Sequence, residues 1–131
     1  MSLSAYRRTL KDTETPRQIE RRVLVRVTSD IAAYADRHDA AENRMERLGV
    51  LSDGLRDALF DNVRLWSTLK ADVLNPGNQL PAELRGSLAG LATFVERHTS
   101  TVLGGEGRVA ALLEVNRPII AGLSGQATES A

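Results

Sequence analysis

Aliphatic residues recur at intervals of three and four along most of this sequence, and that spacing constrains the fold more than any other feature. Such intervals place side chains on one face of an α-helix. The four stripes are Ile19, Val23, Val27, Ile31 and Tyr34; Leu55, Leu59, Val63, Trp66, Leu69 or Lys70, and Val73; Leu84, Leu88, Leu91, Val95 and Val102; and Val109, Leu112, Leu113, Asn116 and Ile120. They predict an all-α protein, a compact single-domain bundle of four to five helices joined by short loops.

The first stripe leaves one alternative open. Residues 23–27 are rich in β-branched side chains, which are typical of strands. No plausible strand partner lies nearby, so we favour a helix. Residues 15–18 form a capping-box pattern with Pro16 at the first helical position, which predicts that the helix starts there. It either continues through the polar stretch that follows or breaks near His38.

Glycine and capping residues predict how the chain enters the second long helix. Gly49 is a natural place for a helix to end in left-handed geometry. Ser52 or Asp53 can then cap the helix that carries the second stripe.

Turn signals mark the later boundaries. The stretch 75–78 reads Asn-Pro-Gly-Asn and predicts a turn, after which Pro81 can sit in the first turn of another helix. Residues 104–105 are both glycine and end that helix. The last helix, from about 107 to 123, contains Pro118, so we expect a kink or an early end there.

The chain of 131 residues has the length of one domain. Residues 1–14 are polar, with Leu3, Tyr6 and Leu10 at helical spacing, and we expect this N-terminal segment to become ordered only on docking. Residues 15–123 form the helical domain. Residues 124–131 form a mobile C-terminal tail.

Charge and composition exclude several classes of protein. Seventeen basic and seventeen acidic residues cancel, so the chain has no overall field that would attract nucleic acid or anionic lipid. The absence of cysteine excludes disulfides and thiolate chemistry. No apolar stretch approaches the roughly 20 residues of a membrane span, and none follows Arg7 and Arg8 as a signal peptide requires. We expect a cytoplasmic protein without membrane insertion.

No residue constellation predicts catalysis. His38 has Glu42 one helical turn away, which is half of a metal site, but further ligands are not evident. The glycine-rich stretch 104–107 lacks the Lys-Ser/Thr that follows a phosphate-binding loop, so a helix connector is the better interpretation. We expect no enzyme activity, no metal and no cofactor.

The first 30 residues carry a basic excess, with seven basic residues against four acidic ones, a net charge of +3. Arg21, Arg22 and Arg26 are therefore candidates for contact with RNA or an acidic partner. Tyr6 is the only aromatic residue among them that could stack on a base, so a solvated helix face is favoured over direct RNA binding.

Several motifs in this sequence resemble those of the FlaF family. Residues 62–69, Asn-Val-Arg-Leu-Trp-Ser-Thr-Leu, together with Asp72 and the Asn-Gln-Leu-Pro stretch at 78–81, resemble the central signature of that family. Its opening is matched by Tyr6, Thr15-Pro16-Arg17 and Glu20-Arg21-Arg22, and its close by Arg97-His98-Thr99, residues 114–117 and Gly122-Leu123. The motifs occur in the family's order over nearly the whole chain, except for roughly residues 36–54.

The resemblance implies a cytoplasmic protein needed for flagellin synthesis, secretion and filament assembly. Such a protein acts as a chaperone that binds the terminal helical segments of flagellin before export, with transient contact to the export apparatus. The alternative is a post-transcriptional regulator that acts through flagellin mRNA or the opposing regulator FlbT, for which the basic start is the local support. The candidates for binding flagellin are Trp66, Leu69, Val73, Leu80, Leu84, Leu88, Leu91 and Val95.

Two of these candidates also have a purely structural interpretation. Trp66, the only tryptophan, lies on an apolar stripe, which favours the core over a partner contact. The stretch 78–81, which contains Leu80, is favoured as a turn and helix start over a recognition surface.

Overall fold

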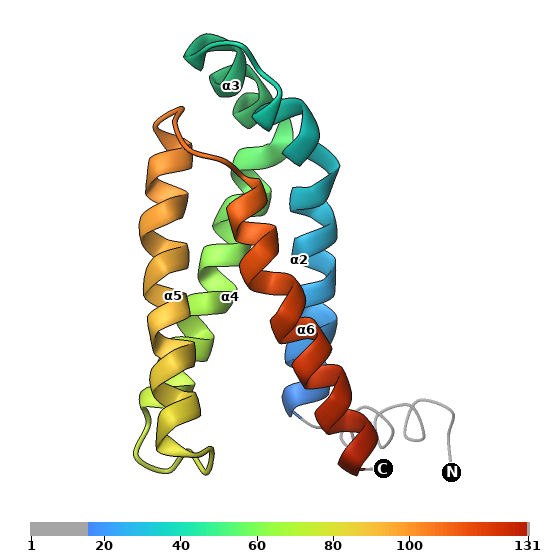
Figure 1. Ribbon diagram of the computed structural model, residues 1–131, viewed down its shortest axis with the longest axis vertical. Coiled ribbons are helices and arrows are strands. Elements are labelled where there is room, and N and C mark those ends of the chain that lie inside the picture. The colour runs from blue at the N-terminus through green and yellow to red at the C-terminus, as the bar shows by residue number, and fades with distance from the viewer. Residues whose placement is uncertain (1–15, 131) are drawn as a thin grey trace, which may run out of the picture.

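Four long helices form an all-α bundle in the computed structural model, which describes the backbone of residues 16–130 and the side chains of residues 18–122 (Figure 1). The long helices are α2 (Pro16–Asp39), α4 (Arg56–Leu74), α5 (Ala82–Leu103) and α6 (Ala110–Ser130). Two short pieces, α3 (Arg44–Val50) and the π-helical segment η1 (Leu51–Leu55), cross the upper end. The predicted fold class is confirmed. The N-terminal segment 1–14 and Thr15 lie outside the described residues.

The pairing of the helices is uneven. α2 packs along α6, and α4 packs along α5, while a smaller contact joins α2 to α4. α5 touches α6 little. The two pairs therefore meet chiefly through α2 and α4, and they diverge toward the lower end in Figure 1. We call that end, where the 75–81 turn lies, the base of the bundle.

α2 starts at Pro16, as predicted, and ends at Asp39, so the helix breaks next to His38. Residues 23–27 are helical, which confirms the helix over the strand. Asn43 then caps α3: its side-chain oxygen accepts a hydrogen bond from the amide of Glu46 at 2.9 Å.

The expected helix end at Gly49 is wrong, as are the expected caps at Ser52 and Asp53. Gly49 lies inside α3, and α3, η1 and α4 follow one another without a side-chain cap. The chain changes direction at Gly54 instead, where φ is +144°. A Cβ at Gly54 would overlap the hydroxyl group of Tyr34, so only glycine suits both the conformation and the space.

The turn at 75–78 and the start of α5 are confirmed. The amide of Asn78 donates to the carbonyl of Asn75 at 3.0 Å, and the amide of Gly77 donates to the Asn75 side chain at 2.8 Å. Pro81 immediately precedes the first residue of α5, where its missing N–H costs nothing.

α6 extends further than predicted. The connection from α5 has positive φ at Gly105 (+88°) and Gly107 (+74°), and the helix then runs from Ala110 to Ser130. It passes through Pro118 and into the tail that we expected from residue 124, so an early end is wrong. Pro118 is exposed, and water can therefore bond the carbonyl of Glu114 that lacks its helical donor.

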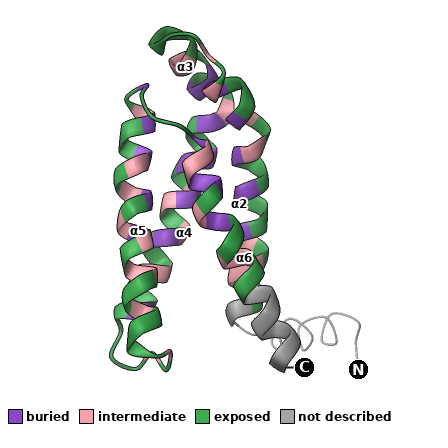
Figure 2. Cartoon of the chain, viewed as in Figure 1, coloured by how far each residue is buried: buried purple, intermediate pink, exposed green. Residues whose placement is uncertain are grey.

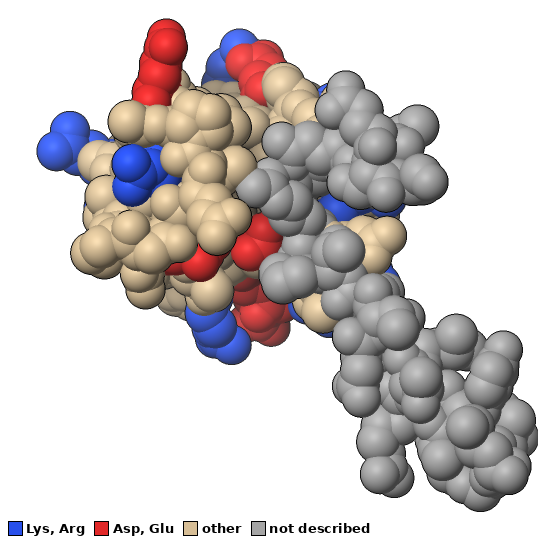
Figure 3. Space-filling view, turned by 90° about the horizontal axis from the view of Figure 1, so that it is seen from below, with Lys and Arg blue, Asp and Glu red and all other residues tan. Residues whose placement is uncertain are grey.

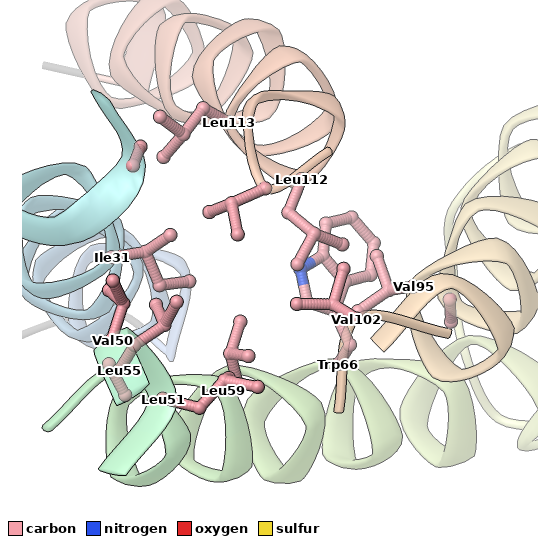
Figure 4. Close-up of a cluster of buried hydrophobic side chains, with 14 residues drawn as sticks. Ile31, Val50, Leu51, Leu55, Leu59, Trp66, Val95, Val102, Leu112 and Leu113 are labelled. Atoms are coloured by element: carbon pink, nitrogen blue, oxygen red, sulfur yellow. The ribbon is translucent and has the colours of Figure 1, made fainter. Parts of the chain in front are cut away.

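The core lies in the upper and middle parts of the bundle. Figure 4 shows the aliphatic side chains of the helices pointing into one space, with Leu112 beside Trp66 and with Val95 and Val102 of α5 near its ring. Figure 2 shows that buried positions become sparse toward the base, where α5 is mainly exposed or intermediate. The apolar stripes are therefore buried in a core at the upper end and in the middle of the bundle, and are partly exposed at the base.

Candidate functional site: the polar layer and the base of the bundle

A buried polar cluster crosses the middle of the bundle. Trp66 Nε1 of α4 donates to Asn116 Oδ1 of α6 at 2.9 Å. Asn116 Nδ2 donates to Thr28 Oγ1 of α2 and to Asn62 Oδ1 of α4, both at 2.9 Å. All four side chains are buried. We call this set (Thr28, Asn62, Trp66 and Asn116) the polar layer, and it ties α2, α4 and α6 together but not α5.

The polar layer is almost fully satisfied. The remaining exception is Asn62 Nδ2, which is buried and has no hydrogen-bond partner among the protein atoms. Leaving one buried donor unpaired costs about 1–3 kcal/mol. Replacing such a buried polar group together with its partners by well-packed apolar residues is often neutral or stabilising.

Sequence reasoning missed the polar layer as a unit. Asn116 is on the apolar stripe of its helix, which is a signal of a buried polar residue. Its partners Asn62 and Thr28 lie 54 and 88 positions away along the chain. No local pattern indicates which polar groups meet across the helices.

Asp39 joins the end of α2 to the start of α6. Its carboxylate oxygens accept hydrogen bonds from the amides of Val109 at 2.8 Å and Ala110 at 2.9 Å, which begin α6. His38 Nδ1 lies 2.8 Å from the same carboxylate and donates to it, because an ionised carboxylate only accepts. Burial by itself raises the pKa of Asp39, but the bonds from His38, Val109 and Ala110 outweigh it and hold the pKa below its usual value.

Two arginines fasten α3 to the glycine-rich connection before α6. Arg44 Nε donates to the carbonyl of Gly104 at 2.9 Å, and Arg47 Nε donates to the carbonyl of Gly105 at 2.6 Å. Arg47 also pairs with Glu106 at 3.5 Å. The connector interpretation of residues 104–107 therefore has a structural basis, and the segment around 38–54 closes the upper end of the bundle.

Both histidines make structural contacts. His38 is completely buried beside Asp39, and His98 Nε2 lies 2.7 Å from the carbonyl of Arg108 while its ring stacks on Phe94. Within the part of the chain that the structure describes, no three His, Asp or Glu side chains are grouped to hold a metal ion.

Two open hollows flank the bend at Gly54, far from the base. One, of about 270 Å³, is lined by Asp30, Tyr34, Asp57 and Asp61 among others. The other, of about 340 Å³, is lined by Arg37, Glu46 and Asp53 among others. Charged and apolar side chains are mixed in both linings.

Aliphatic side chains remain partly uncovered at the base. Leu84 is 38% exposed, and Leu80, Leu88, Leu91 and Leu69 are half-buried. We call these five residues the hairpin face, because they belong to α4, α5 and the turn between them. Viewed from below, the end of this hairpin shows mainly uncharged atoms, with one basic side chain inside that area and other charged side chains around its edge (Figure 3).

The structure divides the predicted partner-binding residues into two groups. Trp66, Val73 and Val95 are buried and belong to the interior, as the stripe of Trp66 favoured. The other five candidates are the hairpin face itself. A partner that docks on this surface therefore meets the leucines and leaves Trp66 covered.

The basic candidates lie elsewhere, on α2. Arg22 and Arg26 are exposed one helical turn apart, and Arg21 is half-buried. No helix within residues 16–130 combines the length and the apolar character needed to cross a membrane.

The sequence also matches one protein family. The match covers residues 2–123, and the family is described as "Flagellar protein FlaF". The chain belongs to the FlaF family. No curated protein sequence matches it, and no solved structure does. The family match includes residues 36–54, where the resemblance of individual motifs was loosest.

Several residues of the motifs that resemble the FlaF family make hydrogen bonds that stabilise the fold. Three of the four residues of the polar layer, Asn62, Trp66 and Asn116, lie in the motifs that resemble the family. Asn78 of the Asn-Gln-Leu-Pro stretch donates to the carbonyl of Asp72 at 3.1 Å, which closes the turn. These motif residues hold the fold, and they place the leucines of the hairpin face beside them.

Proposed function

We propose that this FlaF-family protein is a cytoplasmic, non-enzymatic chaperone and regulator of flagellin that receives the terminal helical segments of flagellin on the hairpin face. Membership of a flagellar protein family supports the connection to flagellin. The observation that carries the proposal is the row of Leu84, Leu88 and Leu91, which a closed four-helix bundle would bury and which is left partly open here. Export of flagellin would then involve transient contact with the export apparatus.

The hairpin face has the chemistry of a groove for an amphipathic helix. Its α5 leucines recur at intervals of four and three, so they form one ridge on the helix. An amphipathic partner helix could lay its own aliphatic stripe along this ridge. A specific interface buries roughly 800 Å² on each partner, and a few aliphatic anchors can supply most of its binding energy.

The test is titration calorimetry and size exclusion with flagellin, full-length and truncated at either end. We expect a stoichiometric complex that is lost when the bound terminus is removed. Leu84→Asp with Leu88→Asp should weaken binding at least about 100-fold, because two charges would be desolvated in an apolar contact. Met45→Asp is the matched control: Met45 is 75% exposed on α3 at the opposite end, and its substitution should leave binding unchanged.

If the hairpin variant and the Met45 control lose affinity equally, flagellin does not bind specifically at the hairpin face. Absence of any complex with full-length flagellin would remove the chaperone function itself.

A second candidate function is post-transcriptional regulation through flagellin mRNA or FlbT. The supporting observation is that Arg22 and Arg26 are exposed on one face of α2, with Arg21 half-buried beside them. Charge reversal at these three positions should abolish regulation of flagellin synthesis without affecting flagellin binding. Regulation that survives the reversal would leave this candidate without support.

A further inference from the structure

We infer that Asn116 is a positioning residue for the base of the bundle: through the polar layer it holds α6 where the hairpin face stays uncovered. The inference deepens the proposed function, on which its relevance to flagellin rests. Its structural content concerns this chain alone and can be tested without a partner.

Asn116 fixes α6 against two helices at once. Its amide accepts a hydrogen bond from Trp66 and donates to Thr28 and Asn62, each at 2.9 Å. These bonds require a particular rotation and height of α6, since hydrogen bonds weaken steeply with misalignment. Apolar contacts impose no such directional demand.

The fourth long helix is outside this arrangement. α5 contributes no residue to the polar layer, and its contact with α6 is small. α5 is held chiefly by α4, with an ion pair between Lys70 and Glu96 at 3.7 Å on their flank. Little direct contact sets the spacing between α5 and α6, so that spacing depends on how α6 packs along α2 and on the polar layer, which joins α6 to α4.

Packing differs on the two sides of the polar layer. The contiguous core includes Val102, Val109 and Leu112 toward the upper end. Toward the base, Leu24 and Val73 are buried but do not belong to that contiguous cluster. On the base side, Leu88 of α5 is only half-buried and does not pack against that cluster, whereas Ile119 of α6 is half-buried at the edge of the cluster.

Replacing the polar layer with apolar groups would remove the constraint on α6. Buried hydrogen-bonded groups often cost stability relative to apolar residues of similar size, and their attested use is to fix register. Without them, α6 could shift toward α5 until the leucines of the hairpin face and Ile119 were better covered. The polar layer thus keeps the hairpin face uncovered at a cost in the free energy of unfolding.

The experiment compares wild type with a variant in which the polar layer is entirely apolar: Thr28→Val, Asn62→Leu, Trp66→Phe and Asn116→Leu. All four positions change together so that no partner is left unsatisfied. Thr99→Val is the matched control, because Thr99 is buried on α5 and its hydroxyl also lacks a partner, but it lies outside the polar layer.

We expect amides of residues 84–91 to exchange with solvent at least about tenfold more slowly in the apolar variant, with thermal stability equal to or above wild type. Flagellin affinity should fall at least about tenfold through loss of access to the hairpin face. Thr99→Val should leave both properties at the wild-type level.

Unchanged exchange at residues 84–91 in a folded apolar variant would overturn the inference. If that variant does not fold, hydrogen exchange of the wild-type protein is the test. The amides of residues 84–91 should then exchange through local openings that leave the amides of residues 99–103 protected. Equal protection of both stretches would overturn the inference. Slower exchange together with no flagellin binding by wild type would uphold the role of Asn116 and refute the proposed function.

Discussion

Asp39 shows how one side chain joins elements that are distant in the sequence. It ends α2 and supplies the two acceptors that begin α6, some 70 residues later. A carboxylate at this position also complements the positive end of the α6 dipole. His38 completes the contact from a fully buried position.

Replacing Asp39 with Ala should lower the free energy of unfolding by about 2 kcal/mol at neutral pH, because two backbone donors lose a charged acceptor. The folded pKa of Asp39 is below its usual value of 3.8, so the wild-type contribution is complete above that pH and is lost as pH falls through the lowered pKa. Urea unfolding across pH 2 to 7 measures this, and the difference between wild type and variant should shrink below about pH 4. A difference independent of pH would contradict the ionic role.

Gly54 presents a second residue-scale prediction. Gly54→Ala should destabilise the protein by about 2 kcal/mol or more, because φ is +144° and the added methyl group would overlap the Tyr34 hydroxyl. Urea unfolding measures the loss. In a Tyr34→Phe background the same substitution should cost less, since part of the overlap is removed; an equal cost would assign the whole effect to the backbone.

At the scale of elements, α3 depends on its contacts with the connection between α5 and α6. A helix of seven residues is too short to be stable alone, so tertiary contacts must hold it. Arg44 and Arg47 supply these contacts, with carbonyls of Gly104 and Gly105 as acceptors. Gly105 has φ of +88°, and a Cβ there would lie 2.7 Å from Arg44 Cγ, so this close approach requires glycine.

Replacing Arg47 with Met should therefore loosen α3 locally. We expect amides of residues 47–51 to exchange faster, with a loss of about 1 kcal/mol in the free energy of unfolding. Hydrogen exchange read by mass spectrometry checks this. Arg56→Met is the control, because Arg56 is exposed on α4. If amides of residues 47–51 exchange equally fast in the Arg56→Met variant, the effect comes from the lost charge and not from the lost hydrogen bond.

At the scale of the whole molecule, Trp66 reports on three packed helices. It is completely buried, bonded to Asn116, and surrounded by residues of α4, α5 and α6. We expect its emission to be poorly quenched by acrylamide and its urea transition to coincide with the loss of helical circular dichroism, as for a single cooperative domain. A fluorescence transition that precedes the loss of helix would show that the middle of the bundle opens separately.

The sequence by itself narrowed the bundle to four or five helices and indicated the apolar face of each helix and the 75–78 turn, because helical spacing and turn chemistry act within a few residues. Helical spacing also placed Leu84, Leu88 and Leu91 on one apolar face, whereas Leu80 was named only as part of the 78–81 motif, and the family resemblance was readable in the motifs. Local signals were insufficient at Gly49, which was expected to end a helix. The chain bends at Gly54 instead, where only glycine suits both the positive φ and the approach of Tyr34.

The tertiary structure alone decided which polar groups meet and which apolar ones stay uncovered. Asn62, Asn116 and Thr28 converge because α6 lies at one height against α2 and α4, and no pattern in any single helix encodes that height. The same arrangement buries Trp66 and leaves Leu84 partly open, although both lie on equally regular stripes. Periodicity indicates the face of a helix, whereas burial depends on how closely another helix approaches it.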